Sequence, residues 1–488
     1  MKILIDTNIL IPLEPFHPKD LEKGRANALN FVSICRNNGI EIYLHPSGKK
    51  DIENDKDSTR QKIRLEAYKK YQELTHPPKV TQEIVDILGN PKKNSHDEID
   101  YDMLASAYHN AIDYFISEDN HLRKKAKLLG LQDQVLSLNE IIDLLLRLYP
   151  DRTPIPEIVE RKPVYSLNDK DPIFQSLRKD YLGFDAWLQK CKREHREALI
   201  IQKGNLLAGI CIFTEESKDK IQELDGRILK LNTFKISAEF SGYKLGELLL
   251  KSIIRIARHE KFQHLYLTTY DNQIQLVSFL EDFGFKVAPV RNERKELILV
   301  KDIFPRKRIS DMSSLEFQIM FGPGIEKLED VSIYLVPIQP RYARLLFRET
   351  EQQGELFSNM LPVENTIRKA YLCHSSNKQL APGDILLFYR SEDTRSIIVV
   401  GVCEYTFRSQ DSKKIVRKIG QRTVYSFSEI ENLTNKEVLV VLFRESRILE
   451  RPISSDELLR FGVIRGSIQS IQKVNEDKLQ WLKQRIVE

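Results

Sequence analysis

Two interruptions rich in proline and glycine divide this chain of 488 residues and limit how it can fold. The first reads YPDRTPIPEIVERKP and holds four prolines over residues 149–163. Proline lacks a backbone N–H and fixes φ, so a stretch this dense in proline breaks helices and strands alike. The second runs from Pro305 to Gly324. The sequence therefore predicts an α/β multidomain protein with domains at 1–148, 165–303 and 328–488, and linkers at 149–164 and 304–327.

Composition excludes several classes of protein. Hydrophobic residues make up 41% of the chain and charged residues 30%, as in soluble globular domains. The 75 basic and 70 acidic residues leave a net charge of +5, so any nucleic-acid-binding surface has to be local. The five cysteines show no CxxC pairing, and no apolar run approaches the length of a membrane span. We expect a cytoplasmic protein with no membrane partner, and the sequence leaves a homo-oligomer open.

The first ten residues, MKILIDTNIL, predict a short buried strand that ends at Asp6. In α/β sheets the carboxyl end of a strand is where chemistry is usually placed. Three further acids of the first domain also stand next to the end of a predicted strand or the start of a predicted helix. Asp51 comes after a predicted strand at 40–44, Asp100 stands ahead of a predicted helix at 103–110, and Asp119 follows a predicted strand at 114–117. In a parallel sheet these four carboxylates reach one edge.

A single carboxylate at a helix start is usually a cap or a partner of the helix dipole. Four of them at successive element ends favour a site for a hard divalent cation, because clustered carboxylates repel one another until a cation neutralises them. Two of the four ligands have rivals in the sequence. Glu53 and Asp55 compete with Asp51, and Asp97 and Asp102 compete with Asp100.

The first domain resembles the PIN-domain ribonucleases, on Ile3-Leu4-Ile5-Asp6-Thr7-Asn8 and on the acids in their order and spacing. The resemblance implies a parallel-sheet α/β/α fold. It also implies that Asp6, Asp51, Asp100 and Asp119 are both the metal ligands and the catalytic residues, with Mg²⁺ or Mn²⁺ activating water against a phosphodiester.

The second domain carries a strand, turn and helix suited to a phosphate-bearing cofactor. Two apolar strands at 198–201 and 207–213 predict a hairpin, and a long strand follows at 229–237. The next turn reads Ser241-Gly242-Tyr243-Lys244-Leu245-Gly246 and leads into an apolar helix. The free N–H groups and the positive dipole end of such a helix form a seat for a pyrophosphate.

This order of elements resembles the GNAT acetyltransferases across 165–303, which implies a mixed α/β fold that binds acetyl-CoA. The cofactor-binding residues would be those of the turn, Ser241, Gly242, Tyr243, Lys244, Leu245 and Gly246. Serine replaces the usual leading arginine or glutamine of the family, and lysine replaces its middle glycine. Many members also place a tyrosine, the proton donor for the leaving thiolate, where this chain has Leu280. Tyr270 and Tyr243 are the candidate replacements.

The third domain alternates short strands with turns, and its Ala381-Pro382-Gly383-Asp384 turn precedes the apolar strand 385–389. It resembles the PUA-related group, nearest the ASCH and EVE domains, which implies a small β-barrel that binds RNA. Exposed aromatic and basic residues would hold the bases. The candidates are Tyr389, Arg390, Phe407 and Arg465, and for each the alternative is ordinary packing or a surface salt bridge.

Three functions fit these resemblances. The first is a metal-dependent endoribonuclease of toxin or defence type, with RNA as its substrate and a separate neutralising, antitoxin-like protein as its partner. The alternative is an N-acetyltransferase that acts on tRNA, aminoacyl-tRNA or protein, with the PIN-like domain mainly binding RNA. The third is a regulator that senses acetyl-CoA and binds RNA. The complete set of four acids and the leucine at position 280 favour the nuclease.

Overall fold

The chain forms two compact units. The first unit comprises residues 1–152, 411–421 and 425–434, and the second comprises 153–410, 422–424 and 435–488. The computed structural model describes residues 1–13, 25–53, 61, 64–65, 68–69, 71–91, 96–149, 159–216, 224–237, 240, 244–305, 311–347 and 366–487. Asp55, Ser241, Gly242 and Tyr243 lie outside these residues.

The first unit is built on a five-stranded parallel sheet in the order β3-β2-β1-β4-β5. Its central strand β1 is buried on both faces from Ile3 to Ile5, which explains why the sequence reads as an unbroken apolar run there. The predicted parallel sheet is confirmed. The strands are β1 (Lys2–Ile5), β2 (Glu41–Leu44), β3 (Gln72–Glu73), β4 (Tyr114–Ile116) and β5 (Val135–Leu136).

Helices flank this sheet, and two of them come from far along the chain. Between β16 and β17, α15 and α16 leave the second unit and join the first. Arg417 of α15 donates to the Asn110 side chain at 2.9 Å, and the ring of Phe427 packs 5.9 Å from that of Tyr149. The helices of this unit are α1 (Thr7–Leu13), α2 (Arg25–Asn37), α3 (Pro46–Glu53), α5 (Gln82–Leu88), α6 (His96–Tyr108), α7 (Asn120–Leu128), α8 (Leu138–Leu148), α15 (Ser412–Ile419) and α16 (Phe427–Leu433).

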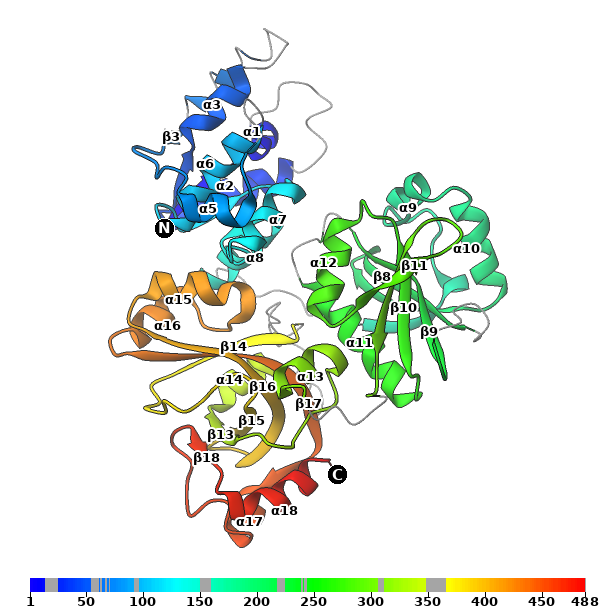
Figure 1. Ribbon diagram of the computed structural model, residues 1–488, viewed down its shortest axis with the longest axis vertical. Coiled ribbons are helices and arrows are strands. Elements are labelled where there is room, and N and C mark those ends of the chain that lie inside the picture. The colour runs from blue at the N-terminus through cyan, green and yellow to red at the C-terminus, as the bar shows by residue number, and fades with distance from the viewer. Residues whose placement is uncertain are drawn as a thin grey trace. The chain divides into compact units, whose positions relative to one another are not determined.

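The second unit opens with a seven-stranded sheet in the order β11-β12-β10-β9-β8-β7-β6. Only β9 and β10 pair in parallel, and the other neighbours are antiparallel. α11 and α12 cover one face and α9 and α10 the other (Figure 1). The strands are β6 (Val159–Pro163), β7 (Glu197–Lys203), β8 (Leu206–Glu216), β9 (Ile228–Ile236), β10 (His264–Thr269), β11 (Lys286–Arg291) and β12 (Leu297–Asp302). The helices are η2 (Val164–Ser166), α9 (Phe174–Asp180), α10 (Phe184–Arg193), α11 (Leu245–His259) and α12 (Ile274–Asp282).

The rest of the second unit, residues 311–410, 422–424 and 435–487, is named the third segment here. Its six-stranded mixed sheet has the order β14-β17-β16-β15-β13-β18. β14 and β18 stand at the two ends of that order among the described strands, so closure into the predicted barrel stays a prediction. The strands are β13 (Ile333–Ile338), β14 (Arg368–Cys373), β15 (Ile385–Arg390), β16 (Ser396–Ser409), β17 (Val438–Ser454) and β18 (Gln472–Lys473). The helices are α13 (Ser314–Phe321), α14 (Pro340–Leu346), α17 (Ser455–Arg460) and α18 (Glu476–Val487), with a 3₁₀ turn η7 (Gly420–Arg422) between α15 and α16.

Two elements stand where the sequence predicted linkers. Strand β6 fills 159–163, because its one proline, Pro163, falls at the last position of an edge strand, where a missing N–H does little harm. Helix α13 begins at a capping box between Ser313 and Glu316, which is a helix start signal. The prolines on either side of this helix had suggested a linker instead. No helix in the described part of the chain is long and apolar enough to cross a membrane.

Candidate functional site

Strands β9 and β10 part in the middle of the second unit's first sheet. Their parallel pairing runs from Ile228 opposite His264 to Leu231 opposite Leu267. Beyond that point β9 continues to Ile236 along β8, and β10 continues along β12. In the described strands, the last five residues of β9 therefore have a hydrogen-bonding partner strand on one side only. A ligand with its own amide groups can extend the sheet at such an edge.

Helix α11 begins a few residues after β9, and its N-terminus belongs to the same site. Lys244 is the N-cap residue and adopts a left-handed conformation with φ of 58°. Leu245 is buried in the core, and a Cβ on Gly246 would lie 3.4 Å from the Phe279 ring. Of the six predicted cofactor-binding residues, these three are placed at the helix start. A helix of 15 residues directs its positive dipole end and unpaired N–H groups there.

Polar side chains from three elements gather on the opposite face of β9 from α11. The rings of Tyr181 and Tyr270 stack with centroids 5.4 Å apart. Burial raises the pKa of Tyr181, and a hydrogen bond to Thr269 opposes the rise. Burial also lowers the pKa of Lys235 on β9, against the pull of the Asp180 carboxylate. Leu280, by contrast, is fully buried in the α11 core cluster.

The sequence analysis missed Tyr181 and Lys235. Tyr181 follows α9, some 90 residues ahead of Tyr270 in the chain, and no spacing rule connects the two. Lys235 could have been noticed in the sequence, because it is a lysine inside the apolar strand LKLNTFKIS. Strand alternation alone, however, accounts for a polar residue at that place.

The acids of the first unit form the other candidate site. Asp6 is 9% exposed and accepts hydrogen bonds from the hydroxyl of Thr7 at 3.2 Å and the amide of Asn8 at 2.7 Å. It also accepts one from the Ser117 hydroxyl at 2.6 Å. Burial raises the pKa of Asp6, the hydrogen bonds from Ser117 and Thr7 oppose the rise, and the charge of Asp100 adds to it.

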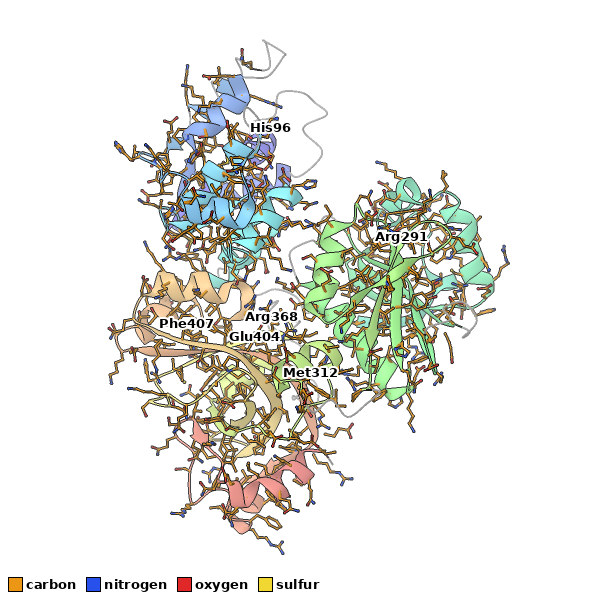
Figure 2. The ribbon with its side chains drawn as sticks, viewed as in Figure 1. His96, Arg291, Met312, Arg368, Glu404 and Phe407 are labelled. Carbon is orange, nitrogen blue, oxygen red and sulfur yellow. The ribbon has the colours of Figure 1, made fainter. Side chains whose placement is uncertain are left out.

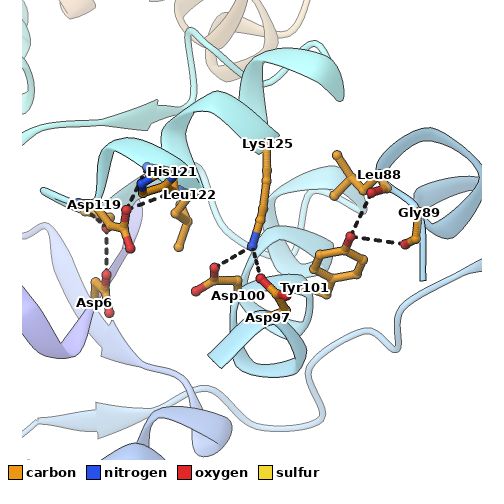
Figure 3. Close-up of polar contacts among 11 residues, drawn as sticks. Asp6, Leu88, Gly89, Asp97, Asp100, Tyr101, Asp119, His121, Leu122 and Lys125 are labelled. Carbon is orange, nitrogen blue, oxygen red and sulfur yellow. Dashed lines mark hydrogen bonds and ion pairs between the residues drawn. The ribbon is translucent and has the colours of Figure 1, made fainter. Parts of the chain in front are cut away.

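Asp119 lies beside Asp6, because β4 is the neighbour of β1 in the sheet (Figure 3). Its N–H donates to the same Ser117 hydroxyl at 3.1 Å. Its carboxylate accepts from the N–H groups of His121 at 2.7 Å and Leu122 at 3.4 Å, so Asp119 is also the N-cap of α7. The capping role considered for these acids is real at this position.

Asp100 has a cation as its partner (Figure 3). The Lys125 ammonium lies 2.8 Å from the Asp100 carboxylate and 2.6 Å from that of Asp97. Burial raises the pKa of Asp100, Lys125 opposes that, and the charge of Asp119 adds to the rise. Asp102, the other rival, accepts a hydrogen bond from the Ser47 hydroxyl at 2.5 Å. Sequence patterns could not place Lys125, which stands in the basic run 123–125.

The metal site predicted on these acids is not confirmed. The charge of Asp100 raises the pKa of Asp6, and the charge of Asp119 raises the pKa of Asp100. Among the described residues, however, no group of three or more His, Cys, Asp or Glu side chains is arranged to hold a metal ion. Asp51 lies in α3, but its side chain is outside the described set, and Glu53 is exposed. Mg²⁺ or Mn²⁺ at these residues stays a prediction.

The predicted RNA-contacting residues of the third segment divide into two groups. Tyr389 is 4% exposed and Arg390 is 6% exposed, and Arg390 is paired with Asp393, so neither offers a surface for stacking and that prediction is wrong. Phe407 (Figure 2) is half-buried and stacks on the exposed Tyr405. Arg465 is exposed.

Comparison with known proteins identifies one segment. Residues 161–285 match the acetyltransferase (GNAT) family. No curated protein matches the chain.

Among solved structures, the ASCH protein from Zymomonas mobilis is similar at 13% identity, covering 31% of this chain and 94% of that chain, with a TM-score of 0.25. The PaiA N-acetyltransferase from Thermoplasma acidophilum in complex with coenzyme A is similar at 15% identity, covering 30% and 99%, with a TM-score of 0.25. A GNAT family acetyltransferase from Elizabethkingia anophelis with acetyl-CoA bound is similar at 14% identity, covering 30% and 97%, with a TM-score of 0.23. The PIN resemblance stays a prediction, whereas residues 161–285 are a GNAT acetyltransferase domain.

Proposed function

We propose that this protein is an N-acetyltransferase that uses acetyl-CoA. The observation that carries the proposal is the parting of β9 from β10, followed at once by the N-terminus of α11, within the segment that matches the family. This reverses the order of preference that the sequence favoured. The acceptor is an amine on tRNA, aminoacyl-tRNA or protein.

Each part of the site has a task in that reaction. The N–H groups at the start of α11 hold the pyrophosphate, and the Lys244 ammonium adds a positive charge beside it. The unpaired edge of β9 beyond Leu231 holds the amide-bearing arm of the cofactor. When bound, acetyl-CoA would supply an activated thioester for transfer of its acetyl group to an acceptor amine, with the CoA thiolate as the leaving group.

The leaving thiolate needs a proton donor, and Leu280 cannot provide one. Tyr270 stands directly after β10, is half-buried, and presents a phenol on the side of the sheet where Tyr181 and Lys235 gather. We assign the proton transfer to the Tyr270 hydroxyl. Its stacking on Tyr181 limits the rotation of the ring.

The test is acetyl-CoA binding by calorimetry, followed by acetyl-dependent release of free CoA with tRNA, aminoacyl-tRNA and peptide amines as acceptors. Tyr270→Phe should lower kcat about a hundredfold and leave acetyl-CoA affinity unchanged, because only the proton donor is lost. The matched control is Tyr165→Phe, since Tyr165 is 55% exposed and contacts the His195 ring. Binding with no turnover for any acceptor would favour the acetyl-CoA-sensing regulator, and no binding would defeat the proposal.

A second function is favoured by a specific contact in the first unit. Asp6 and Asp119 stand at the ends of neighbouring parallel strands, where the Ser117 hydroxyl donates to the Asp6 carboxylate and accepts the backbone N–H of Asp119. We propose that these acids, with Asp51 and Asp100, bind Mg²⁺ or Mn²⁺ for endoribonucleolytic cleavage of toxin or defence type. The Lys125 ammonium at Asp100 then has to move, or it remains and the unit binds RNA without cutting it.

RNA cleavage with and without Mg²⁺ or Mn²⁺ decides this second function. Asp6→Asn and Asp119→Asn should each abolish cleavage, because they remove charge and keep the hydrogen-bonding shape. Asp113→Asn is the control, since Asp113 stands just ahead of β4, at the opposite edge of the same sheet, and accepts the Lys2 N–H. Cleavage that survives both Asp6→Asn and Asp119→Asn would exclude these acids as the catalytic residues. Co-purification of a neutralising protein would test the toxin class.

A further inference from the structure

Side chains on one face of α11 connect the acetyltransferase domain to the third segment. Glu247, Lys251 and Arg258 are spaced by four and seven residues, which keeps them within about 40° of one another around the helix. The backbone N–H of Ile367 donates to a Glu247 carboxylate oxygen at 3.0 Å. Arg258 donates to the carbonyl oxygen of Pro323 at 2.7 Å.

Glu445 of β17 stands at the centre of this interface. One carboxylate oxygen lies 2.5 Å from the Lys251 ammonium, and the other lies 3.1 Å from the Lys369 ammonium of β14. The side chains of the three residues are 7%, 3% and 0% exposed for Lys251, Glu445 and Lys369. Lys369 also donates to the carbonyl oxygen of Leu346 at 2.7 Å. Charges this deeply buried interact strongly, and removing one partner of a buried ion pair is strongly destabilising.

A second set of contacts fixes the end of α12 to the same sheet. Arg444, the residue before Glu445, donates to the carbonyl oxygen of Asp282 at 3.1 Å, and its guanidinium lies 5.7 Å from the centre of the Phe283 ring. Lys301, fully buried, donates to the carbonyl oxygens of Phe283 at 2.8 Å and of Met320 in α13 at 2.6 Å. The helix that carries the cofactor seat and its neighbour are thus both held from outside their own domain.

We propose that Glu445 is a positioning residue for acetyl-CoA: through Lys251 it sets where the N-terminus of α11 lies, so the third segment completes the cofactor site. Lys251 stands six residues into α11, about 9 Å along the axis from the seat at Leu245. Ile367 strengthens the link, since its side chain is part of the α11 core cluster. The inference rests on the proposed acetyl-CoA binding for its functional consequence, but the mechanical link does not depend on it.

The test compares Glu445→Gln with a matched change elsewhere in the third segment, in the full chain. Glu445→Gln keeps the shape of the side chain and removes the carboxylate that lies between Lys251 and Lys369. Glu457→Gln is the control, because Glu457 pairs with Arg485 and caps α17, within the third segment alone. We expect acetyl-CoA affinity to fall about five- to tenfold in Glu445→Gln. In Glu457→Gln the affinity should stay within twofold of wild type.

Amide hydrogen exchange tests the positioning role of Glu445 without any cofactor. Amides 245–251 should exchange faster in Glu445→Gln and at the wild-type rate in Glu457→Gln, and Glu445→Asp should restore part of the protection. If the wild type binds no acetyl-CoA, the proposed function fails, and the exchange of α11 still decides the positioning role. Unchanged affinity together with unchanged exchange in a folded Glu445→Gln protein would overturn the inference.

Discussion

His45, directly after β2, has an imidazole that is only 3% exposed. The Ser47 N–H donates to its Nδ1 at 3.1 Å, so a neutral ring carries its proton on Nε2. That atom has no acceptor among the described residues. Burial lowers the pKa of His45 from its ordinary value of 6.5, against the opposing charges of Asp102 and Glu73. The folded state therefore disfavours the protonated ring.

This residue makes the first unit sensitive to acid. Between the lowered folded pKa and 6.5 the unfolded chain binds more protons than the folded one, so the free energy of unfolding falls as the pH falls through that window. Above 6.5 the contribution is constant. His45→Asn, whose Oδ1 can take the Ser47 N–H, should flatten the acid side of a pH–stability curve measured by denaturant melts. His109→Asn, at an exposed position, should leave the curve as it is, and an equal slope in both variants would contradict this account.

Gly284 is a residue whose identity the packing dictates. It adopts φ of +84°, and a Cβ there would lie 2.2 Å from the carbonyl oxygen of Ile319 in α13. Gly284→Ala should therefore destabilise the second unit by about 2–4 kcal/mol. Gly183 separates the two causes, because it has φ of +80° with open space around it. Gly183→Ala should cost about 1 kcal/mol, and thermal melts that show equal losses would mean that the contact with α13 is unimportant.

At the N-terminus of α11, one residue is expected to lower the stability of the second unit and to strengthen the binding of acetyl-CoA. Its N-cap, Lys244, occupies a left-handed conformation that glycine adopts without strain. Lys244→Gly should raise the free energy of unfolding of the second unit by about 1 kcal/mol. It should also weaken acetyl-CoA binding, since an ammonium beside the pyrophosphate is lost. Calorimetric titration and melts of one preparation measure both, and unchanged affinity would remove Lys244 from the phosphate seat.

Helices and strands were the features that the sequence predicted best. The strand that ends at Asp6 and the strand at 385–389 were predicted because each is an apolar run bounded by polar or turn residues. Helix α6 was predicted too short, since its acidic first turn, Asp97 and Glu98, reads as a polar loop until the helix dipole is considered. The side-chain partners of the site residues were out of reach, because Lys125 and Tyr181 meet their partners only through the tertiary fold.

At the scale of the whole molecule, domain boundaries were the weakest prediction. Proline and glycine mark breaks in secondary structure, but they do not indicate that residues 411–421 and 425–434 return to the first unit. The third segment likewise reads as a separate domain, although Glu445 and Arg444 bind α11 and α12 through buried contacts. Such pairings are non-local, and no periodicity in either partner encodes them.

The two units should unfold in separate steps. Ser137 and Glu140 form the capping box of α8 in the first unit, so Ser137→Ala should lower the stability of that unit by about 1 kcal/mol. Gly284→Ala should move only the other transition. Scanning calorimetry of the full chain checks both variants, and a single transition that shifts as one in each would show that the two units unfold cooperatively.

Because α15 and α16 belong to the first unit but come late in the chain, this unit is completed late during synthesis. About 260 residues separate the end of the first stretch of the first unit from the helices that finish it. At a synthesis rate of about 5–20 residues per second, the ribosome needs roughly 15 to 50 seconds to supply them. Throughout that interval the first unit lacks two of its helices, and the segment that matches the acetyltransferase family is synthesised before them.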